Sequence, residues 1–307
     1  MAGIDVTSKT TKYRKALSRF GAQASEFLQP ALENRWSRFG LYILAIYVFV
    51  GLFGPYFPLA PPFENLQTPA GDYAQLQSPS LRFPLGTTYV GYSVLSRTIH
   101  AFQTSLMVGL LSAVLVVGVG VNIGLVAGYF GGRVEDVLMG LTDLMFGLPF
   151  YPFAIVLITI LGSSMVNIAF VIALIFWREI ARVTRSETLS LKERTYIKSA
   201  RAVGTSDLKI MYVHILPNLI PLILIYFVFG ITWGILLEAS LSFIGLGDPN
   251  AISWGVMLHN AFSQGVLTRA WWWVIPPAFS LWLFIWSLYV VARSLEDNVD
   301  AHVEGGA

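Results

Sequence analysis

The chain contains several long runs of apolar residues, and these runs restrict its possible folds more than any other feature. A helix that crosses a bilayer needs about 20 mostly apolar residues. Only 12% of the 307 residues are charged, about half the share that a soluble domain carries. Little therefore remains to make a solvated surface, and we predict an all-α, polytopic membrane protein.

Six stretches are long and apolar enough to be predicted as membrane spans. The third and fourth are separated by only three residues. One helix over both would be about 60 Å long at 1.5 Å per residue, roughly twice the hydrocarbon thickness of a bilayer, so we divide this run into two spans. The predicted spans cover residues 39–59, 105–130, 137–161, 166–177, 215–244 and 271–292.

Basic residues gather on one side of this six-span arrangement. All but three of the 20 Lys and Arg residues fall in or next to the segments on that side, and the exceptions are Arg82, Arg97 and Arg269. Short loops rich in Lys and Arg stay in the cytoplasm, so both termini are predicted to be cytoplasmic. A five-span arrangement would destroy the asymmetry. The segments 1–38, 181–214 and 293–307 are then inside, and 60–101 is outside.

The N-terminal segment 1–38 has two possible structures. Tyr13, Leu17, Phe20, Ala24 and Phe27 recur at helical spacing, which predicts an amphipathic helix on the inner leaflet. A disordered basic tail is equally compatible with the same composition.

The cytoplasmic segment 181–214 has the pattern of a helix, a glycine turn and a second helix. Gly204 stands where a helix C-cap would, and Ser206 where the next helix would begin. The segment is longer than packing requires, so we predict a rigid projection for a cytosolic partner, or a helix pair lying on anionic lipid. Residues expected to share a face are Tyr196, Ala200 and Val203 in the first helix, and Leu208, Met211, Tyr212 and Ile215 in the second.

Four ordered motifs resemble those of one known family. Residues 196–204 (YIKSARAVG), followed by Leu216 and Pro217, are similar to the EAA loop of permease subunits in ATP-binding-cassette (ABC) importers. The motifs at 84–97, 127–132 and 238–255 resemble those of the dipeptide and oligopeptide permeases. The chain is identified as the second, C-type permease subunit, because one span and a short outside segment precede a five-span core at 102–292.

This resemblance implies a type I ABC-importer permease with a MetI-like core in the cytoplasmic (inner) membrane. The implied partners are a second homologous permease, two cytosolic ATPases that hold ATP and Mg, and an extracytoplasmic binding protein. The implied substrates are di- and oligopeptides, with oligosaccharides or a nickel complex as the alternative; a secondary transporter or channel working alone is the less favoured reading. The implied ATPase-coupling residues are Lys198, Ser199, Ala200, Arg201, Ala202, Val203, Gly204, Asp207, Leu216 and Pro217.

Two of these positions depart from the family pattern. Lys198 occupies the acidic position of the EAA motif, and Ser199 occupies the position of its first alanine. A contact that the family makes from that acidic position to an ATPase lysine or arginine would therefore be reversed in sign.

The sequence contains no motif typical of a catalytic or an ATP-binding site. No lysine follows a glycine, so the chain lacks the Gly-Lys of a P-loop that would cradle ATP phosphates. We predict a non-catalytic subunit that binds no cofactor or metal. The net charge of +2 is too balanced for a nucleic-acid binder, which leaves membrane lipid and other proteins as partners.

Three residues inside the spans are gate or pathway candidates. Asp143 and Glu238 are ionisable residues in apolar surroundings, where a charge is expensive and functional by default. A satisfied structural carboxylate is the alternative for Glu238. Pro149, just after Gly147, is expected to break the helix of the third span, and broken helices can line a substrate path.

Small residues recur every four positions in the second span. Gly120, Gly124 and Gly128 have the spacing that lets two helix backbones approach closely inside a membrane. We predict a packing contact with a neighbouring helix there; a gating hinge is the other reading.

Overall fold

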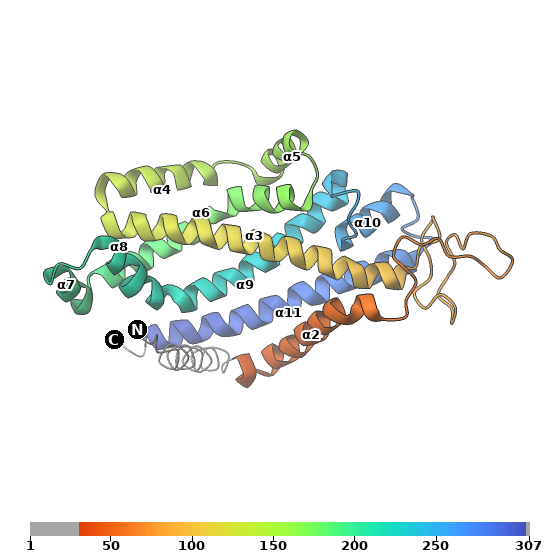
Figure 1. Ribbon diagram of the computed structural model, residues 1–307, viewed down its shortest axis with the longest axis horizontal. Coiled ribbons are helices and arrows are strands. Elements are labelled where there is room, and N and C mark those ends of the chain that lie inside the picture. The colour runs from red at the N-terminus through yellow and green to blue at the C-terminus, as the bar shows by residue number, and fades with distance from the viewer. Residues whose placement is uncertain (1–30, 305–307) are drawn as a thin grey trace, which may run out of the picture.

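The computed structural model describes residues 31–304, and over this range the chain is helical apart from loops and two isolated β-bridges. The predicted all-α class is confirmed, while the predicted amphipathic helix of the N-terminal segment lies outside the described residues. The helices, drawn in Figure 1, are α2 (Arg35–Phe53), α3 (Val94–Phe130), α4 (Gly132–Phe146), α5 (Phe150–Leu161), α6 (Met165–Lys192), α7 (Thr195–Ala202), α8 (Asp207–Lys209), α9 (Leu216–Leu241), α10 (Trp254–Ser263) and α11 (Trp271–Glu304). Three short turns join them: the 3-10 turn η1 (Gly54–Tyr56) and the π-helical turns η2 (Ile210–Ile215) and η3 (Ser242–Leu246).

Within the described residues, four helices are long and apolar enough to cross a membrane by themselves. They are α2, α3, the continuous helical stretch Asp207–Leu246, and α11 up to Asp297. A fifth span results if α4 and α5, which are bent by 94°, are taken together. The apolar fourth span predicted at 166–177 falls within α6, whose remainder is charged. The structure thus contains four or five candidate spans, and the count of six remains a prediction.

Several helices extend beyond the predicted spans. Helix α3 begins at Val94 because the Ser93 hydroxyl accepts a hydrogen bond from the Ser96 N–H and caps it, so this helix starts well before the predicted span at 105–130. Helices α6 and α11 run on to Lys192 and Glu304. No Gly or Pro occurs in α6, and none occurs in α11 after Pro277. Parts of the predicted cytoplasmic segments 181–214 and 293–307 are therefore helical.

Helix α3 runs through the middle of the bundle, packed against α6 and α9, as Figure 1 shows. Its contact with α6 uses the glycines predicted from their spacing. A Cβ added at Gly120 would lie 2.6 Å from the Trp177 carbonyl oxygen, and one at Gly128 would lie 2.7 Å from the Thr188 Cβ. Only glycine allows this close approach, so the predicted packing contact is confirmed.

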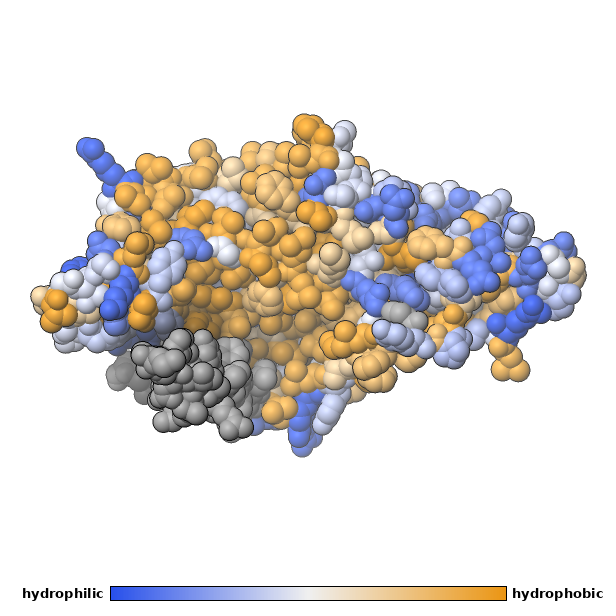
Figure 2. Space-filling model, viewed as in Figure 1, coloured by the Kyte–Doolittle hydropathy of each residue, from blue (hydrophilic) through white to orange (hydrophobic). Residues whose placement is uncertain are grey.

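The surface reflects the membrane environment. Figure 2 shows apolar residues over the middle of the bundle and hydrophilic residues gathered toward its two ends. One end holds the segment 54–93, and the opposite end holds α7 and α8 (Figure 1). The second of these ends carries the predicted coupling residues.

Candidate functional site

Helix α7 and the short α8 form the helix, turn and helix predicted for the cytoplasmic segment. Gly204 joins them with a φ of +81°, the left-handed conformation that glycine adopts without steric cost. Its N–H donates to the Arg201 carbonyl at 3.0 Å, and the Thr205 N–H donates to the Ala200 carbonyl at 3.1 Å. The predicted glycine turn is confirmed, and Ser206 precedes α8 as expected, although its side chain makes no capping hydrogen bond.

The face predicted for the second helix was wrong in part. Met211 and Ile215 are buried together with Ile210, whereas Leu208 and Tyr212 are exposed. For Tyr212 the physical reason is the π-helical turn η2, over Ile210–Ile215. A π-helix bonds residue i to i+5 rather than i+4, so it rotates the following residues away from the face that α-helical spacing would give.

One buried side chain attaches α7 to the bundle. Ile197 is fully buried and packs in a cluster that includes Leu125 and Tyr129 of α3. The Tyr129 hydroxyl donates to Asp207 Oδ1 at 2.5 Å, and the Arg201 guanidinium lies 5.4 Å from the centre of the Tyr129 ring. The inner end of α3 therefore contacts both arms of the glycine turn.

Lys198 and Ser199, the two departures from the EAA pattern, bond within their own segment. Lys198 Nζ lies 2.9 Å from Glu193 Oε2, and the Lys198 ammonium holds the pKa of Glu193 below its ordinary value. Both side chains are exposed, so the ion pair adds little stability. The Ser199 hydroxyl donates to the Thr195 carbonyl at 3.0 Å.

The tip of this element presents apolar side chains to its surroundings. Val203 is 82% exposed, Leu208 66% and Tyr196 45%, and we call these three residues the coupling face. The neighbouring Ser199, Arg201, Ala202 and Asp207 are also exposed. An exposed apolar patch surrounded by polar residues is typical of an interaction site. Leu216 is partly buried and Pro217 exposed where α9 begins, a position that tolerates proline.

Comparison with known proteins decides the class of the chain. Residues 120–305, more than half of the sequence, match the family described as the binding-protein-dependent transport system inner membrane component. The chain belongs to this family. It is therefore a multi-pass permease of the inner membrane, a non-catalytic subunit that works with the other components of an ABC transport complex.

Individual permeases support the same assignment. The chain is 32% identical over 287 residues to the di/tripeptide transport system permease protein DppC of Pseudomonas aeruginosa, covering 92% of this chain and 93% of that one. It is 35% identical over 231 residues to the glutathione transport system permease protein GsiD of Pectobacterium atrosepticum, with 75% and 76% covered. It is 29% identical over 269 residues to the dipeptide transport system permease protein DppC of Bacillus subtilis, with 87% and 82% covered.

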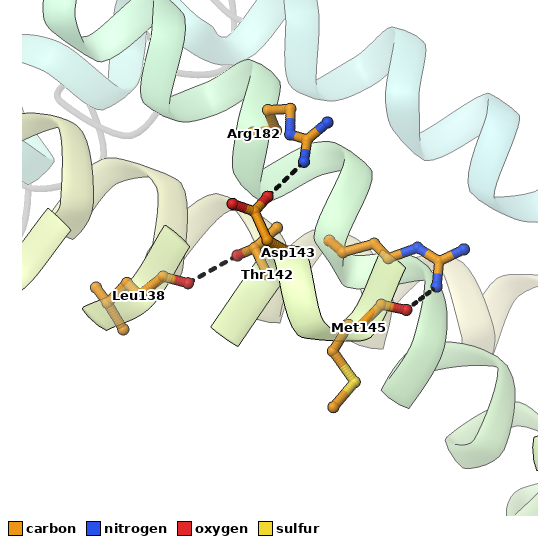
Figure 3. Close-up of polar contacts among 6 residues, drawn as sticks. Leu138, Thr142, Asp143, Met145 and Arg182 are labelled. Carbon is orange, nitrogen blue, oxygen red and sulfur yellow. Dashed lines mark hydrogen bonds and ion pairs between the residues drawn. The ribbon is translucent and has the colours of Figure 1, made fainter. Parts of the chain in front are cut away.

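Asp143 of the permease lies near the end of α4 and is paired (Figure 3). Its carboxylate accepts a hydrogen bond from Arg182 of α6 at 2.6 Å, while Arg178 donates to the Met145 carbonyl. The two guanidinium groups lie 4.6 Å (Arg178) and 4.2 Å (Arg182) from the centre of the Phe146 ring. The two arginines thus fasten α6 to the end of α4.

Pro149 stands at the break between α4 and α5. It occupies the cap position of α5, and Gly147 that of α4. The two helices are bent by 94° there, because proline has no N–H to continue the α4 hydrogen bonds. The predicted break in the third span is confirmed.

Glu238 lies late in α9 and is only 3% exposed. Its Oε1 accepts a hydrogen bond from the Ser242 hydroxyl at 2.7 Å, whereas its Oε2 is buried without a hydrogen-bond partner among the described residues. Helix α10 packs tightly nearby, since a Cβ added at Gly255 would lie 2.7 Å from the Ala239 Cα. Glu238 lies near the end of α9 that is remote from the coupling face. The candidate residues thus occupy separate regions of the permease.

A cavity between α3, α6 and α9 was missed by the sequence analysis. The predicted fourth span ends at Trp177 and the predicted cytoplasmic segment begins at residue 181, so Glu179 is assigned to neither. The absence of Gly and Pro from residues 165–192 was the signal that could have placed Glu179 on the same helix. Among the described residues, no group of three His, Cys, Asp or Glu is arranged to hold a metal ion. The residues that line the cavity are Val116, Ile172, Phe176, Glu179, Ile180, Tyr226, Phe229, Gly230 and Trp233.

Proposed function

We propose that this permease forms, with a second homologous permease, the membrane pathway for short peptides, and that its coupling face docks on one of two cytosolic ATPases. An extracytoplasmic binding protein would deliver the substrate, and ATP and Mg would be bound by the ATPases alone. The observation that carries the proposal is the coupling face, an apolar tip on a projection that is tied to the ends of α3 and α9.

The contacts of α7 suggest how ATPase movement would reach the membrane. A push on the coupling face passes to α3 through Ile197 and Tyr129, and to α9 through the buried Met211 and Ile215. Close-packed interiors transmit such displacements rather than absorbing them. We infer that α3 and α9 tilt when the ATPases close, which would open and close the pathway between the two permeases.

The topology that we propose has six spans with both termini in the cytoplasm. Helices α4 and α5 together make the third span, and the apolar part of α6 makes the fourth. The distribution of Lys and Arg supports this count, because a five-span arrangement would spread these residues over both sides of the membrane.

Short peptides are the substrates best supported by the relatives, whose names specify di/tripeptides, dipeptides and glutathione. All of these are small peptides. Oligosaccharides or a nickel complex are the alternative, carried by the same kind of machinery. The less favoured alternative, a secondary transporter or channel, would move its substrate without any ATPase.

The proposal is tested by reconstituting the complete complex in liposomes and measuring uptake of a labelled dipeptide. We expect uptake that requires ATP, the ATPases and the binding protein. A labelled oligosaccharide and a nickel complex serve as competitors. ATP-dependent uptake of either competitor with no uptake of the dipeptide would overturn the substrate assignment, and uptake by this chain alone would overturn the ABC mechanism.

A further inference from the structure

The cavity between α3, α6 and α9 combines aromatic walls with one acidic side chain. Its volume is about 170 Å³, and its aromatic residues are Phe176, Tyr226, Phe229 and Trp233. A cavity of about 150 Å³ can hold one benzene ring, so this one has room for one amino-acid side chain. The acidic side chain is Glu179.

The cavity opens on the surface of the bundle, where Glu179 and Trp233 are exposed, and its wall on α3 is formed by the middle of that helix. Val116, one of its lining residues, is about 17 Å from the outer end and about 21 Å from the inner end of the apolar stretch 105–130 of α3, at 1.5 Å per residue. Gly230 of α9, which lines the cavity, lies close to Ala113 of α3. A Cβ added at Gly230 would lie 3.1 Å from the Ala113 Cα. A ligand against Val116 would be about halfway across the bilayer, with Glu179 just beyond the apolar run 166–177 of α6.

Glu179 has no ion-pair partner among the described residues. The arginines nearest to it on α6, Arg178 and Arg182, are bonded to Met145 and Asp143 of α4. Both arginines are therefore bonded to α4 rather than to Glu179. An ionisable residue at membrane depth that is not paired within its own chain is a functional candidate.

The aromatic walls suit a ligand that carries a cationic group next to an apolar side chain. The rings of Phe176 and Trp233 are stacked with their centres 6.2 Å apart, and those of Tyr226 and Phe229 are 6.3 Å apart. Aromatic rings attract an ammonium group as well as apolar side chains, and a carboxylate adds a charge-assisted hydrogen bond. The N-terminal residue of a peptide offers both an ammonium group and a side chain.

We propose that this cavity is a transient binding site for the N-terminal residue of the transported peptide, with Glu179 accepting its α-ammonium group and the aromatic walls holding its side chain. This inference rests on the proposed function, because it assumes a peptide substrate. It assigns to Glu179 a direct contact with substrate inside the membrane.

The test exploits the absence of cysteine from the chain. The Tyr226→Cys variant in the complete reconstituted complex is labelled with a permeant maleimide, with and without the dipeptide Phe-Ala, loaded binding protein and ATP. We expect Phe-Ala at about ten times its Kd to slow labelling about tenfold, since the free fraction of a site falls as 1/(1 + [L]/Kd). Phe229→Cys provides a second labelling position, and Val213→Cys, exposed outside the cavity, should show no protection.

The charge is tested by adding Glu179→Gln to the Tyr226→Cys variant. The peptide concentration that gives half protection should rise about tenfold, because a charge-assisted hydrogen bond is replaced by a neutral one. Glu187→Gln, at an exposed acid further along α6, should leave it unchanged.

The outcomes separate this inference from the proposed function. Uptake of Phe-Ala without protection of either cysteine variant would overturn the cavity assignment alone. Labelling that is blocked by assembly with the second permease, before any peptide is added, would also overturn it, because the cavity would then be an interface between subunits. A complex that does not take up Phe-Ala would overturn the peptide assignment and this inference with it.

Discussion

At the scale of single residues, the connection between the coupling face and the helix bundle depends on a few side chains. Ile197 is the buried anchor of α7, and Tyr129 reaches from α3 to Asp207 on the other arm of the turn. The exposed Val203 and Leu208 lie on the same element but contribute little to its packing. Anchoring and docking can therefore be separated by mutation.

Replacing Ile197 with Ala should loosen α7 while leaving the coupling face intact. Removing a buried isoleucine side chain costs about 2–5 kcal/mol, so residues 195–209 should show faster hydrogen exchange and each ATP hydrolysed should drive less uptake. Val203→Ala, at an 82% exposed position, is the matched control and should leave exchange unchanged. Equal exchange in both variants would contradict the anchoring role of Ile197.

Glu238 is the gate candidate that a conservative change can test. Glu238→Gln keeps the size of the side chain and its hydrogen bond with Ser242 but removes the ionisable carboxyl group. If Glu238 helps to close the outer gate, uptake should fall severalfold while co-purification with the other subunits is unchanged. Normal uptake by the assembled variant complex would rule out the gating role and leave a structural carboxylate.

The individual site residues were predictable to different degrees. Gly204 could be located because a left-handed turn between two helical patterns demands glycine. The close contact of the α3 glycines with a neighbouring helix could be predicted from their four-residue spacing. The partners of Lys198 and Asp143 could not be predicted. Lys198 meets Glu193 where α6 ends, and Asp143 meets Arg182 only because α6 packs against α4.

At the scale of elements, the glycine turn between α7 and α8 tests whether the tip must be rigid. A Cβ at Gly204 would have open space around it, so Gly204→Ala acts through the backbone alone and should cost about 1–2 kcal/mol at this left-handed position. Gly204→Asn should be milder, because Asn tolerates the conformation better. We expect coupled uptake to fall in the order Gly, Asn, Ala.

Gly140→Ala is the control for that series, since Gly140 also has open space but lies within helix α4. It should be neutral or slightly stabilising. Equal uptake by Gly204→Ala and the wild type would indicate that the turn conformation does not matter for coupling.

The contact between α3 and α6 should be intolerant of added bulk. A side chain at Gly124 would collide with the Ala181 carbonyl oxygen and lie within 2.7 Å of the Thr184 Cβ. Gly124→Val should therefore lower the temperature at which the extracted protein loses its monodisperse form, at a cost of about 1–3 kcal/mol or more. Gly118→Val, on the same helix with no atom within 4 Å of an added Cβ, should have a much smaller effect; similar losses in both would contradict the packing role.

Apolar length predicted most elements but not their irregularities. The spans at α2, α3, α9 and α11 could be predicted because any run of about 20 apolar residues must be buried in lipid. The direction of the α4 to α5 bend and the π-helical turn η2 could not, because both depend on packing against neighbouring helices. That turn is why Tyr212 is exposed rather than on the predicted face.

At the scale of the whole molecule, polar function is divided between the two ends of an apolar bundle. The segment 54–93 lies at one end and the coupling face at the other (Figure 1), with the cavity that contains Glu179 between them. If an ATPase docks on the coupling face as proposed, its movement would pass along α3 and α9 to reach the cavity and the opposite end. Such long helices, 37 residues in α3 and 26 in α9, are suited to act as levers.

The central claim is that the coupling face docks on an ATPase, and cysteine crosslinking tests it most directly. In the complete complex, Val203→Cys should crosslink to the cytosolic ATPase through a short bifunctional maleimide, and the yield should change when ATP is bound. Leu81→Cys, exposed in the segment 54–93 at the opposite end, should not crosslink to it. An assembled, active complex in which Val203→Cys forms no ATPase crosslink, or in which Leu81→Cys forms one, would contradict the account.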